Sequence, residues 1–414
     1  MSGAGKRWKP YPTYKDSGAE WLGEVPEGWA VKRLKFGVDD INQKCLEEAP
    51  LTPFVALEHI EPWTGKLMVD ESSQSDGQPS CYQSDDVLFC KLRPYLAKVH
   101  LAKVNGICTS ELLVLRAQHG IFPKYLHRFL LSRDTIDCIT ASTYGAKMPR
   151  ANWEFIGNLL LPIPPLPEQR AIAAFLDQQC AQIDSLIEKK QRMLDLLDEK
   201  RRAVITQAVT RGLDPTVPMK NSGVEWLGMV PEGWEIFSLR RLFCVKSGDM
   251  TTSTDLFDEG FQVFGGNGFR GYFDKWNTNK GVIIIGRYGA LCGNIKISPD
   301  RIWATEHAFR VVPFMVFNVH FMAFFLEHLN LNRLSTRAAQ PGLNSEMVRN
   351  HLIALPPLPE QQAIADYLDA QCAAMDSQRE NLEKSIELLR EYRASLITHA
   401  VTGKIDVRDV APLQ

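Results

Sequence analysis

Pro164-Pro165-Leu166-Pro167-Glu168-Gln169 opens a stretch that, after Pro167, contains no proline or glycine until Gly212. The same six residues return at Pro356–Gln361, again at the start of a long stretch of this kind. Proline followed by an acidic residue suits the unpaired amides and the positive dipole end of a helix N-terminus. Each copy therefore predicts the first turn of a helix of about 40 residues, roughly 60 Å long at 1.5 Å per residue.

Apolar residues recur along both predicted helices at steps of three and four residues. A narrow stripe with this heptad-like spacing, on so long a helix, favours packing against another long helix. We predict that the two helical arms pair as an antiparallel coiled coil, and the alternative is that each packs separately on its own domain. The predicted interface residues are Ile172, Leu176, Ile183, Leu194, Leu197 and Val204 in the first arm and Ile364, Leu368, Met375, Leu382, Ile386, Leu389 and Leu396 in the second.

The repeat extends beyond the arms. Trp21–Trp29 reads WLGEVPEGW, and Trp226–Trp234 reads WLGMVPEGW. Two copies of one unit within a chain can be related by a two-fold axis, which suits a partner that is itself two-fold, such as duplex DNA.

The two copies agree best in the arms. Residues 164–214 and 356–406 share 27 identities in 51 aligned positions, concentrated at the two ends of each arm. Val25 and Val230 are 205 positions apart, whereas Pro164 and Pro356 are 192 apart, so the first copy is 13 residues longer between its markers.

The segments before the arms, roughly 21–160 and 226–352, are predicted to mix strands and short helices. Pro26-Glu27-Gly28 and its second copy, 231–233, fit a turn with proline at the second position and glycine at the fourth. Alternating or apolar runs predict strands from Trp29 and Trp234 and at 87–89, 112–115 and 281–285, and helices at 125–132 and 317–329.

Composition excludes several protein classes. The 414 residues carry a net charge of −2, which argues against a non-specific DNA coat but not against local DNA reading. No run of 18 apolar residues and no signal peptide is present, so we expect a cytoplasmic protein without a membrane span. The nine cysteines contain no Cys-x-x-Cys pair, which predicts reduced thiols and no zinc site.

No catalytic motif is convincing. Gly266–Gly271 matches G-x-G-x-x-G, but a predicted strand and turn follow it where a dinucleotide site requires a helix. A phosphate-binding loop, an H-E-x-x-H motif and the base-holding motif of amino-methyltransferases are all missing from the sequence. We therefore predict no catalytic residue, no metal site and no cofactor in this chain.

Basic and polar loops remain as candidate DNA contacts. No acidic residue lies between Asp86 and Glu111. Residues 139–153 and 334–345 carry basic and amide side chains and no acidic residue. Arg and Lys suit guanine edges and phosphates, Asn and Gln suit adenine, and glycine allows a backbone to approach a duplex closely. The candidates are Lys91, Arg93, Tyr95, Lys98, Tyr144, Lys147, Arg150, Arg270, Lys275, Asn277, Lys280, Arg287, Tyr288, Arg337, Gln340 and Asn344.

These features together resemble the specificity subunits of type I restriction–modification systems. The resemblance rests on Glu20–Trp29 with its second copy, on the Pro-Pro-Leu-Pro-Glu-Gln segment that opens each arm, and on Asp86–Leu96 and Ile284–Ala290. It covers essentially the whole chain, in the same order.

The resemblance implies an α+β protein with two mixed α/β target-recognition domains separated by two long helices that form an antiparallel coiled coil, with an internal pseudo-two-fold repeat. Each recognition domain is expected to read one half of a bipartite, asymmetric site in double-stranded DNA. Two modification subunits would dock on the helices, and restriction subunits would join them. S-adenosylmethionine, ATP and Mg are expected in those partner subunits.

The resemblance also divides the chain. The expected domains are residues 1–160 and 216–355 for target recognition, 161–215 and 356–408 for the helical regions, and 409–414 for a C-terminal tail. Three alternatives stay open: a methyltransferase or nuclease that contains these domains, a scaffold that binds protein rather than DNA, and the specificity subunit of a modification-only enzyme.

Overall fold

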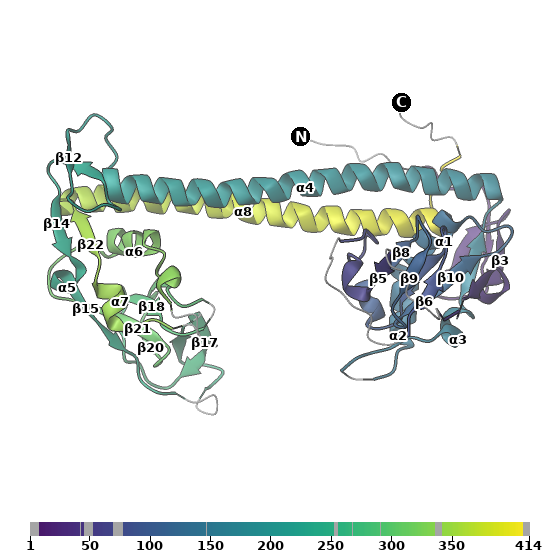
Figure 1. The fold of residues 1–414 in the computed structure, drawn as a ribbon, viewed down its shortest axis with the longest axis horizontal. Coiled ribbons are helices and arrows are strands. Elements are labelled where there is room, and N and C mark those ends of the chain that lie inside the picture. Colours follow the sequence, from purple (N-terminus) through teal and green to yellow (C-terminus); the bar gives the residue numbers. More distant parts are fainter. Residues whose placement is uncertain are drawn as a thin grey trace. The chain divides into compact units, whose positions relative to one another are not determined.

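The computed structural model describes residues 8–41, 43–44, 53–68, 78–145, 147–251, 256–266, 268–289, 291–335 and 342–408. The chain forms two compact units: unit 1 comprises residues 1–190 and 384–414, and unit 2 comprises residues 191–383. Each unit holds a globular part and a section of each of two long helices, α4 (Leu166–Arg211) and α8 (Leu358–Val401) (Figure 1). The two predicted helical regions thus each contain one continuous helix, of 46 and 44 residues.

The other elements of unit 1 are β1 (Tyr14–Asp16), β2 (Glu24–Pro26), β3 (Ala30–Arg33), η1 (Leu34–Phe36), β4 (Val38–Asp40), β5 (Phe54–Val55), η2 (Leu57–His59), β6 (Ser80–Tyr82), β7 (Val87–Cys90), η3 (Pro94–Leu96), β8 (Val99–Leu101), β9 (Gly106–Cys108), β10 (Leu112–Ala117), α1 (Pro123–Leu130), α2 (Arg133–Ala141), α3 (Trp153–Ile156) and β11 (Leu160–Ile163).

Those of unit 2 are β12 (Met219–Asn221), β13 (Met229–Pro231), β14 (Glu235–Ser238), α5 (Leu239–Leu242), β15 (Phe243–Ser247), β16 (Phe261–Gly265), β17 (Gly268–Phe273), β18 (Ile283–Gly286), β19 (Ile295–Ile297), β20 (Ile302–Ala304), β21 (Ala308–Pro313), α6 (Val319–His328), η5 (Leu331–Leu334), α7 (Ser345–Arg349) and β22 (Leu352–Leu355). The predicted strands and short helices are present, with boundaries displaced by a few residues.

The two long helices pair as an antiparallel coiled coil, as predicted. In unit 2, Arg379 of α8 contacts Asp198 of α4, and three residues further along α4 Arg201 contacts Asp376 at 3.2 Å. The α8 number falls as the α4 number rises, which defines the antiparallel direction. All thirteen predicted interface residues are buried or half-buried; Leu197, Val204, Leu382 and Leu389 are the half-buried ones.

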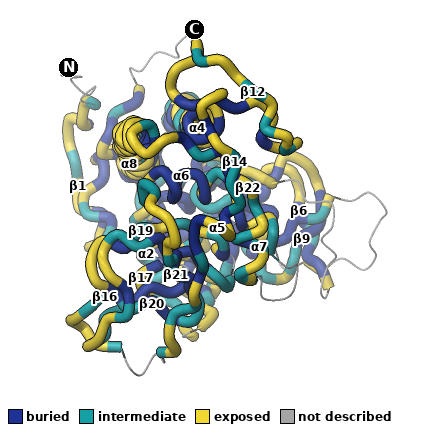
Figure 2. The backbone as a smooth tube through the Cα atoms, turned by 90° about the vertical axis from the view of Figure 1, so that its left-hand side faces the viewer, coloured by how far each residue is buried: buried dark blue, intermediate teal, exposed yellow. Residues whose placement is uncertain are grey.

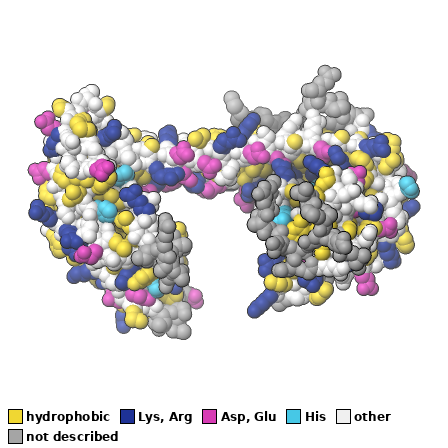
Figure 3. Space-filling model, viewed as in Figure 1, with side chains coloured by type: hydrophobic (Ala, Val, Ile, Leu, Met, Phe, Trp, Pro, Cys, Tyr) yellow, Lys and Arg dark blue, Asp and Glu magenta, His cyan; other side chains and the backbone are white. Residues whose placement is uncertain are grey.

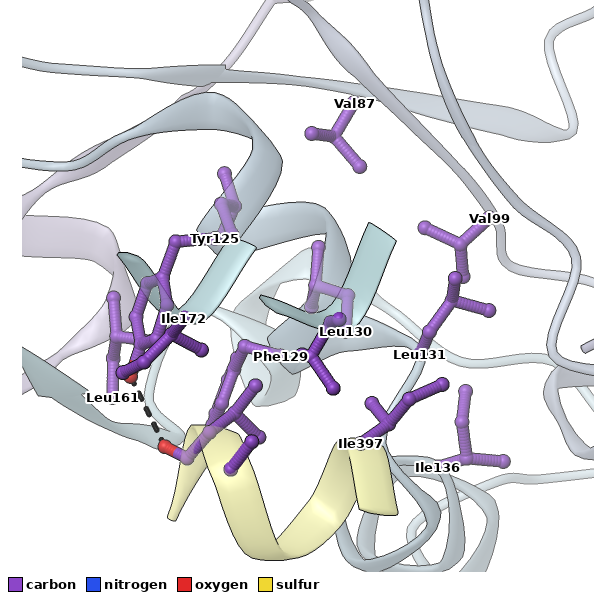
Figure 4. Packing of buried hydrophobic residues seen from close by; sticks show 14 of the residues in the cluster. Val87, Val99, Tyr125, Phe129, Leu130, Leu131, Ile136, Leu161, Ile172 and Ile397 are labelled. Atoms are coloured by element: carbon purple, nitrogen blue, oxygen red, sulfur yellow. Dashed lines mark hydrogen bonds between the residues drawn. The ribbon is translucent and has the colours of Figure 1, made fainter. Parts of the chain in front are cut away.

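Near their ends the arms also belong to the globular cores. In unit 1, Ile172 and Leu176 of α4 and Ile397 of α8 share one hydrophobic cluster with Tyr125 and Phe129 of α1 (Figure 4). In unit 2, α6 takes the corresponding place, with residues 321–326 all buried (Figure 2). Each globular part therefore packs on both arms, because the apolar stripes are wide enough there to serve two contacts.

The two globular parts share one sheet plan. A four-stranded antiparallel sheet has the order β4-β10-β7-β8 in unit 1 and β15-β21-β18-β19 in unit 2. A smaller sheet in each part contains a parallel pair, β5 with β9 and β16 with β20. The copies differ in its third strand, which is β6 beside β9 in unit 1 and β17 beside β16 in unit 2.

The repeated sequence motifs join each globular part to its arm. The indole Nε1 of Trp29 donates to Glu168 Oε1 at 3.0 Å, and that of Trp234 donates to Glu360 Oε1 at 3.1 Å. In each copy, the glutamate in the first turn of the long helix accepts a hydrogen bond from the last tryptophan of the repeated segment that begins Trp-Leu-Gly, which we call the WLG motif.

The neighbouring glutamine is a second link. Buried Gln169 accepts from the Phe122 amide and donates to the carbonyls of Gly120 and Pro164, each at 2.8 Å. Gln361 is the counterpart: it accepts from the Asn318 amide and donates to the Pro356 carbonyl, also at 2.8 Å.

The tight turn before each first long strand differs from the prediction. The amide of Trp29 donates to the carbonyl of Pro26 at 2.9 Å, so proline occupies the first turn position and Gly28 the third. Trp234 and Pro231 repeat this bond at 3.0 Å. The prediction was wrong by one residue because the proline ends a strand, and its carbonyl is left free to close the turn.

The arms carry an equivalent pair of ion pairs. Arg393 of α8 donates to Asp184 of α4 at 2.9 Å in unit 1, and Arg201 with Asp376 repeats this pair in unit 2. Arg393 is 6% exposed and its second nitrogen donates to the Trp63 carbonyl at 2.9 Å. The pair in unit 1 thereby also holds a loop of the globular part.

That loop rests on two buried histidines. His100 Nδ1 lies 2.8 Å from the Gly65 carbonyl, and His127 Nε2 lies 3.1 Å from the Val99 carbonyl. Burial is the largest cause that lowers the pKa of His127, to about 3, and with the nearby Arg128 charge it keeps this imidazole neutral. Burial lowers the pKa of His100 in the same direction.

Seven of the described cysteines are free thiols, as expected, whereas Cys81 is disulfide-bonded, contrary to the expectation. Among the described residues, no helix is long and apolar enough to cross a membrane.

The glutamine link predicts a local loss of stability. Replacing Gln169 by Leu leaves one amide and two carbonyls without their partner, and we expect the free energy of unfolding to fall by about 3 kcal/mol. Urea unfolding measures the loss, and faster hydrogen exchange at residues 118–130 assigns it to unit 1. Gln182→Leu, at an exposed position of the same helix, is the control. Equal effects of the two changes would contradict the role of this link.

The neutral histidine predicts a pH dependence. The pKa of His127 is about 3 in the folded state and about 6.5 when unfolded. The unfolded chain therefore binds the extra proton below about pH 6.5. Stability from this group is complete above that pH and declines by about 1.4 kcal/mol per pH unit toward pH 3. Melting temperatures across this range should show a smaller slope for His127→Gln, and exposed His119→Gln should keep the wild-type slope.

Candidate nucleic-acid interface

In unit 1, three loops meet at one end of the four-stranded sheet. The amide of Lys91, just after β7, donates to the Glu111 carbonyl at 3.1 Å. The Ala151 amide donates to the Lys91 carbonyl at 2.8 Å. We call this place junction 1 and define it as residues 91–93, Glu111, residues 144–145 and residues 147–151. It unites two of the basic segments that sequence reasoning proposed separately.

In unit 2, the same backbone arrangement recurs. The amide of Arg287, just after β18, donates to the His307 carbonyl at 2.9 Å, and the Leu343 amide donates to the Arg287 carbonyl at 2.9 Å. We call this place junction 2 and define it as residues 287–289, residues 306–307 and residues 342–344. Lys91 corresponds to Arg287, and Glu111 corresponds to His307. The two junctions have one backbone plan and different side chains.

Junction 1 presents basic and aromatic side chains to solvent. Arg93 and Lys147 are exposed, and Tyr144 is 60% exposed. Arg93 has a left-handed backbone with φ of 51°, and its amide donates to the Pro149 carbonyl at 2.8 Å. A non-glycine residue in this region is strained, and such strain is common at functional sites. Tyr95, 44% exposed, follows in η3.

Three predicted residues of unit 1 are less free. Lys98 Nζ donates to the Leu57 carbonyl at 2.7 Å. Arg150 Nη2 donates to Glu111 Oε1 at 3.0 Å, and Lys91 is half-buried. The ammonium group of Lys98 thus has a partner within the fold. The bond to Glu111 uses Nη2 of Arg150, and the guanidinium carries further N–H groups that could serve as donors.

In unit 2, Arg270, Lys275 and Lys280 are exposed. Asn277 is occupied within the fold: its Oδ1 accepts from the Ala304 amide at 2.8 Å, and its Nδ2 donates to Asp249 Oδ2 at 2.7 Å.

The remaining candidates of unit 2 also have partners. Arg287 donates to Ser247 Oγ at 3.2 Å, and its guanidinium lies 4.7 Å from the ring of half-buried Tyr288. Asn344 caps α7, because its Oδ1 accepts from the Met347 amide at 2.9 Å. Arg337 and Gln340 lie outside the described residues, and the DNA contacts of all sixteen candidates stay predictions.

The glycines of unit 2 let backbones approach each other. A Cβ on Gly286 would lie 2.2 Å from the Gly266 carbonyl oxygen, and a Cβ on Gly266 would lie 2.6 Å from the Tyr288 carbonyl oxygen. These glycines therefore bring the β16–β17 hairpin against junction 2. Their close backbone approach is internal to the fold, whereas the sequence suggested an approach to a duplex. The same hairpin contains the G-x-G-x-x-G match, so β17 follows the first glycines where a dinucleotide site requires a helix.

Sequence reasoning missed the acidic members of the junctions. Glu111 served only as the boundary of an acid-free stretch, yet it lies within junction 1. Glu306 and His307 were not considered, although Glu306 Oε1 lies 3.2 Å from His307 Nε2 in unit 2. Their position directly before the apolar strands β10 and β21 was the available signal.

The charged side chains are mixed over the molecule. Lys and Arg side chains lie on both globular parts, and acidic and basic side chains are intermixed along the arms (Figure 3). Within the described residues, no group of three or more His, Cys, Asp and Glu is arranged to hold a metal ion.

Comparison with known proteins assigns the family. Residues 80–194 and 231–388 match the model of the type I restriction modification DNA specificity domain. The chain belongs to this family. The two matched segments each span a globular region and part of an arm, so the specificity domain occurs twice in this specificity subunit.

Curated relatives have the same description. The EcoDI specificity subunit of Escherichia coli is 27% identical over 192 residues, which are 45% of this chain and 43% of that subunit. The matched stretch thus spans less than half of that relative. The MjaVIII specificity subunit of Methanocaldococcus jannaschii is 22% identical over 425 residues, covering 93% of this chain and 95% of its own length.

Solved structures share the fold. A chain from a study of complex assembly and conformational transition of the type I R-M system aligns with a TM-score of 0.73 and 18% identity, covering 91% of this chain and 98% of that one. The HsdS subunit from Thermoanaerobacter tengcongensis aligns with a TM-score of 0.50 and 19% identity, covering 92% and 98%.

Proposed function

We propose that this specificity subunit binds double-stranded DNA sequence-specifically within a type I restriction–modification complex, and that it is not itself catalytic. The observation that carries the proposal is the pair of junctions. One backbone plan occurs twice, with Lys91, Glu111 and Arg150 in the first and Arg287, His307 and Gly342 in the second. A repeated backbone plan with different side chains suits two domains that read different half-sites. The DNA site would then be bipartite and asymmetric.

The arms support a second part of the proposal, that the coiled coil sets the spacer between the half-sites. A continuous helix of 46 residues is about 69 Å long. The arms are joined to the globular parts by the partly buried hydrogen bonds Trp29–Glu168 and Trp234–Glu360. The length of the paired helices is therefore available to fix the separation of the readers.

Exposed apolar residues support docking of two modification subunits on the arms. Leu196 in unit 2 is 60% exposed, and its repeat counterpart Leu388 in unit 1 is 57% exposed. Leu166 and Leu358 form a second such pair, at 39% and 47%. Each unit thus offers one copy of the same apolar positions, which suits two identical partners. Those subunits would carry S-adenosylmethionine, and restriction subunits with ATP and Mg would join them.

DNA binding in the reconstituted complex tests the surface. Lys147→Ala removes one exposed cation of junction 1. We expect weaker binding to all sequences alike and a reduction of about 1 in the slope of log K against log salt. Titrations at several salt concentrations measure the slope. Lys15→Ala, an exposed lysine on β1 outside the junction, should leave it unchanged. Absence of any salt-dependent binding by the wild-type complex would favour the protein-scaffold alternative.

Lengthening both arms tests the spacer. Seven residues inserted after Arg192 and after Lys384, which are equivalent positions, preserve the heptad pairing and add about 10 Å. We expect the methylated site to gain about three base pairs of spacer at about 3.4 Å each, with both half-sites unchanged. Methylome sequencing of a host that carries the variant reads the result. The same insertion after Pro215, in the exposed loop that follows α4, should leave the spacer as it was, and an unchanged spacer in the arm variant would count against this role.

A further inference from the structure

The carboxylate of Glu111 in junction 1 has one oxygen without a partner among the described residues. Its Oε1 accepts from Arg150 Nη2 at 3.0 Å. Its Oε2 is buried and has no hydrogen-bond partner within the part of the chain that the structure describes. A buried acceptor without a donor is unfavourable, and the Glu111 side chain as a whole is 25% exposed. Both observations point to a donor supplied from outside.

The surroundings define that donor. The Arg150 side chain is 42% exposed, and Arg93, Tyr144 and Lys147 are exposed nearby on the same junction. A ligand at this place has to tolerate several cations and still bring an N–H group to the carboxylate. Duplex DNA has both properties, because its phosphates attract the cations and its base edges carry amino groups in the major groove.

The Glu–Arg pair matches one base pair in particular. A carboxylate accepts from the N4 amino group of cytosine, and an arginine donates to O6 and N7 of guanine. These groups lie side by side on the major-groove edge of a cytosine–guanine pair. We propose, resting on the DNA-binding function proposed above, that Glu111 is a base-reading residue that recognises this cytosine, with Arg150 on the paired guanine.

Junction 2 supports the assignment independently. There the carboxylate belongs to Glu306, one residue earlier in the equivalent loop, and its Oε2 is likewise buried without a partner among the described residues. Its Oε1 faces His307 Nε2 at 3.2 Å in place of an arginine. Each junction thus has one carboxylate oxygen without a partner among the described residues. The position of the glutamate in the loop differs between the two junctions, and so does the side chain beside it. This difference fits two distinct half-sites.

The test uses the full chain assembled with its modification subunits and a library of randomised DNA duplexes. Methylated products are sequenced for the wild type and for E111Q, which keeps the size of the side chain and removes its charge. We expect the preference for cytosine over the other bases to fall about 10- to 100-fold at one position of one half-site. The other half-site should stay unchanged. E306Q should change the base preference in the other half-site and leave the first half-site unchanged.

E154Q, at an exposed carboxylate of α3 in the same unit, is the matched control and should leave the motif unchanged. A folded E111Q complex with the wild-type motif would overturn the base-reading role while the proposed function stands. If E111Q melts well below the wild type, the same sequencing is done with E111D, which keeps the charge beside Arg150 but withdraws the carboxylate by one methylene group. A reduced preference for cytosine supports the base-reading role, and the wild-type motif overturns it. A wild-type complex without any bipartite motif would instead overturn the proposed function.

Discussion

The structure depends on the buried hydrogen bonds that tie each globular part to the first turn of an arm. Glu168 and Gln169 lie at a helix start, where unpaired amides favour an acidic residue on electrostatic grounds alone. The fold uses them further: the glutamate accepts from the indole of Trp29, and the glutamine accepts from an amide and donates to two carbonyls of unit 1. Buried polar groups require such partners, so a fixed orientation between each globular part and its own arm follows.

The same constraint explains where the two copies of the repeat agree and where they differ. Ion pairs recur at equivalent positions, Arg393 with Asp184 and Arg201 with Asp376. Each arm also ends in a glycine with a left-handed backbone, Gly212 and Gly403, packed against a tryptophan ring of the WLG motif. These are contacts within the frame. The junction side chains lie outside these contacts. Backbone hydrogen bonds of one plan join the loops of both junctions, so the side chains there differ without changing that plan.

A consequence is a division of labour within a single chain. The residues that join the arms to the globular part of unit 1, Glu168, Gln169 and Arg393, all have hydrogen-bond partners there. In the proposed readers, by contrast, one carboxylate oxygen of Glu111 and one of Glu306 are buried without a partner among the described residues.

The two long helices, their pairing, the repeated segments and the family were predictable from the sequence, because heptad spacing and repeated motifs are local patterns. The basic segments at 91–98 and 144–150 were predictable in the same way. Which of the candidate side chains are free of partners within the fold was not, because those partners are distant in sequence. Asn277 and Lys98 are engaged within the fold, and Gly266 and Gly286 allow two backbone segments to pack closely on each other. The place of Glu111 in junction 1 also depends on a partner distant in sequence. In the sequence it only ends a stretch without acidic residues, whereas in the structure it lies beside Arg150.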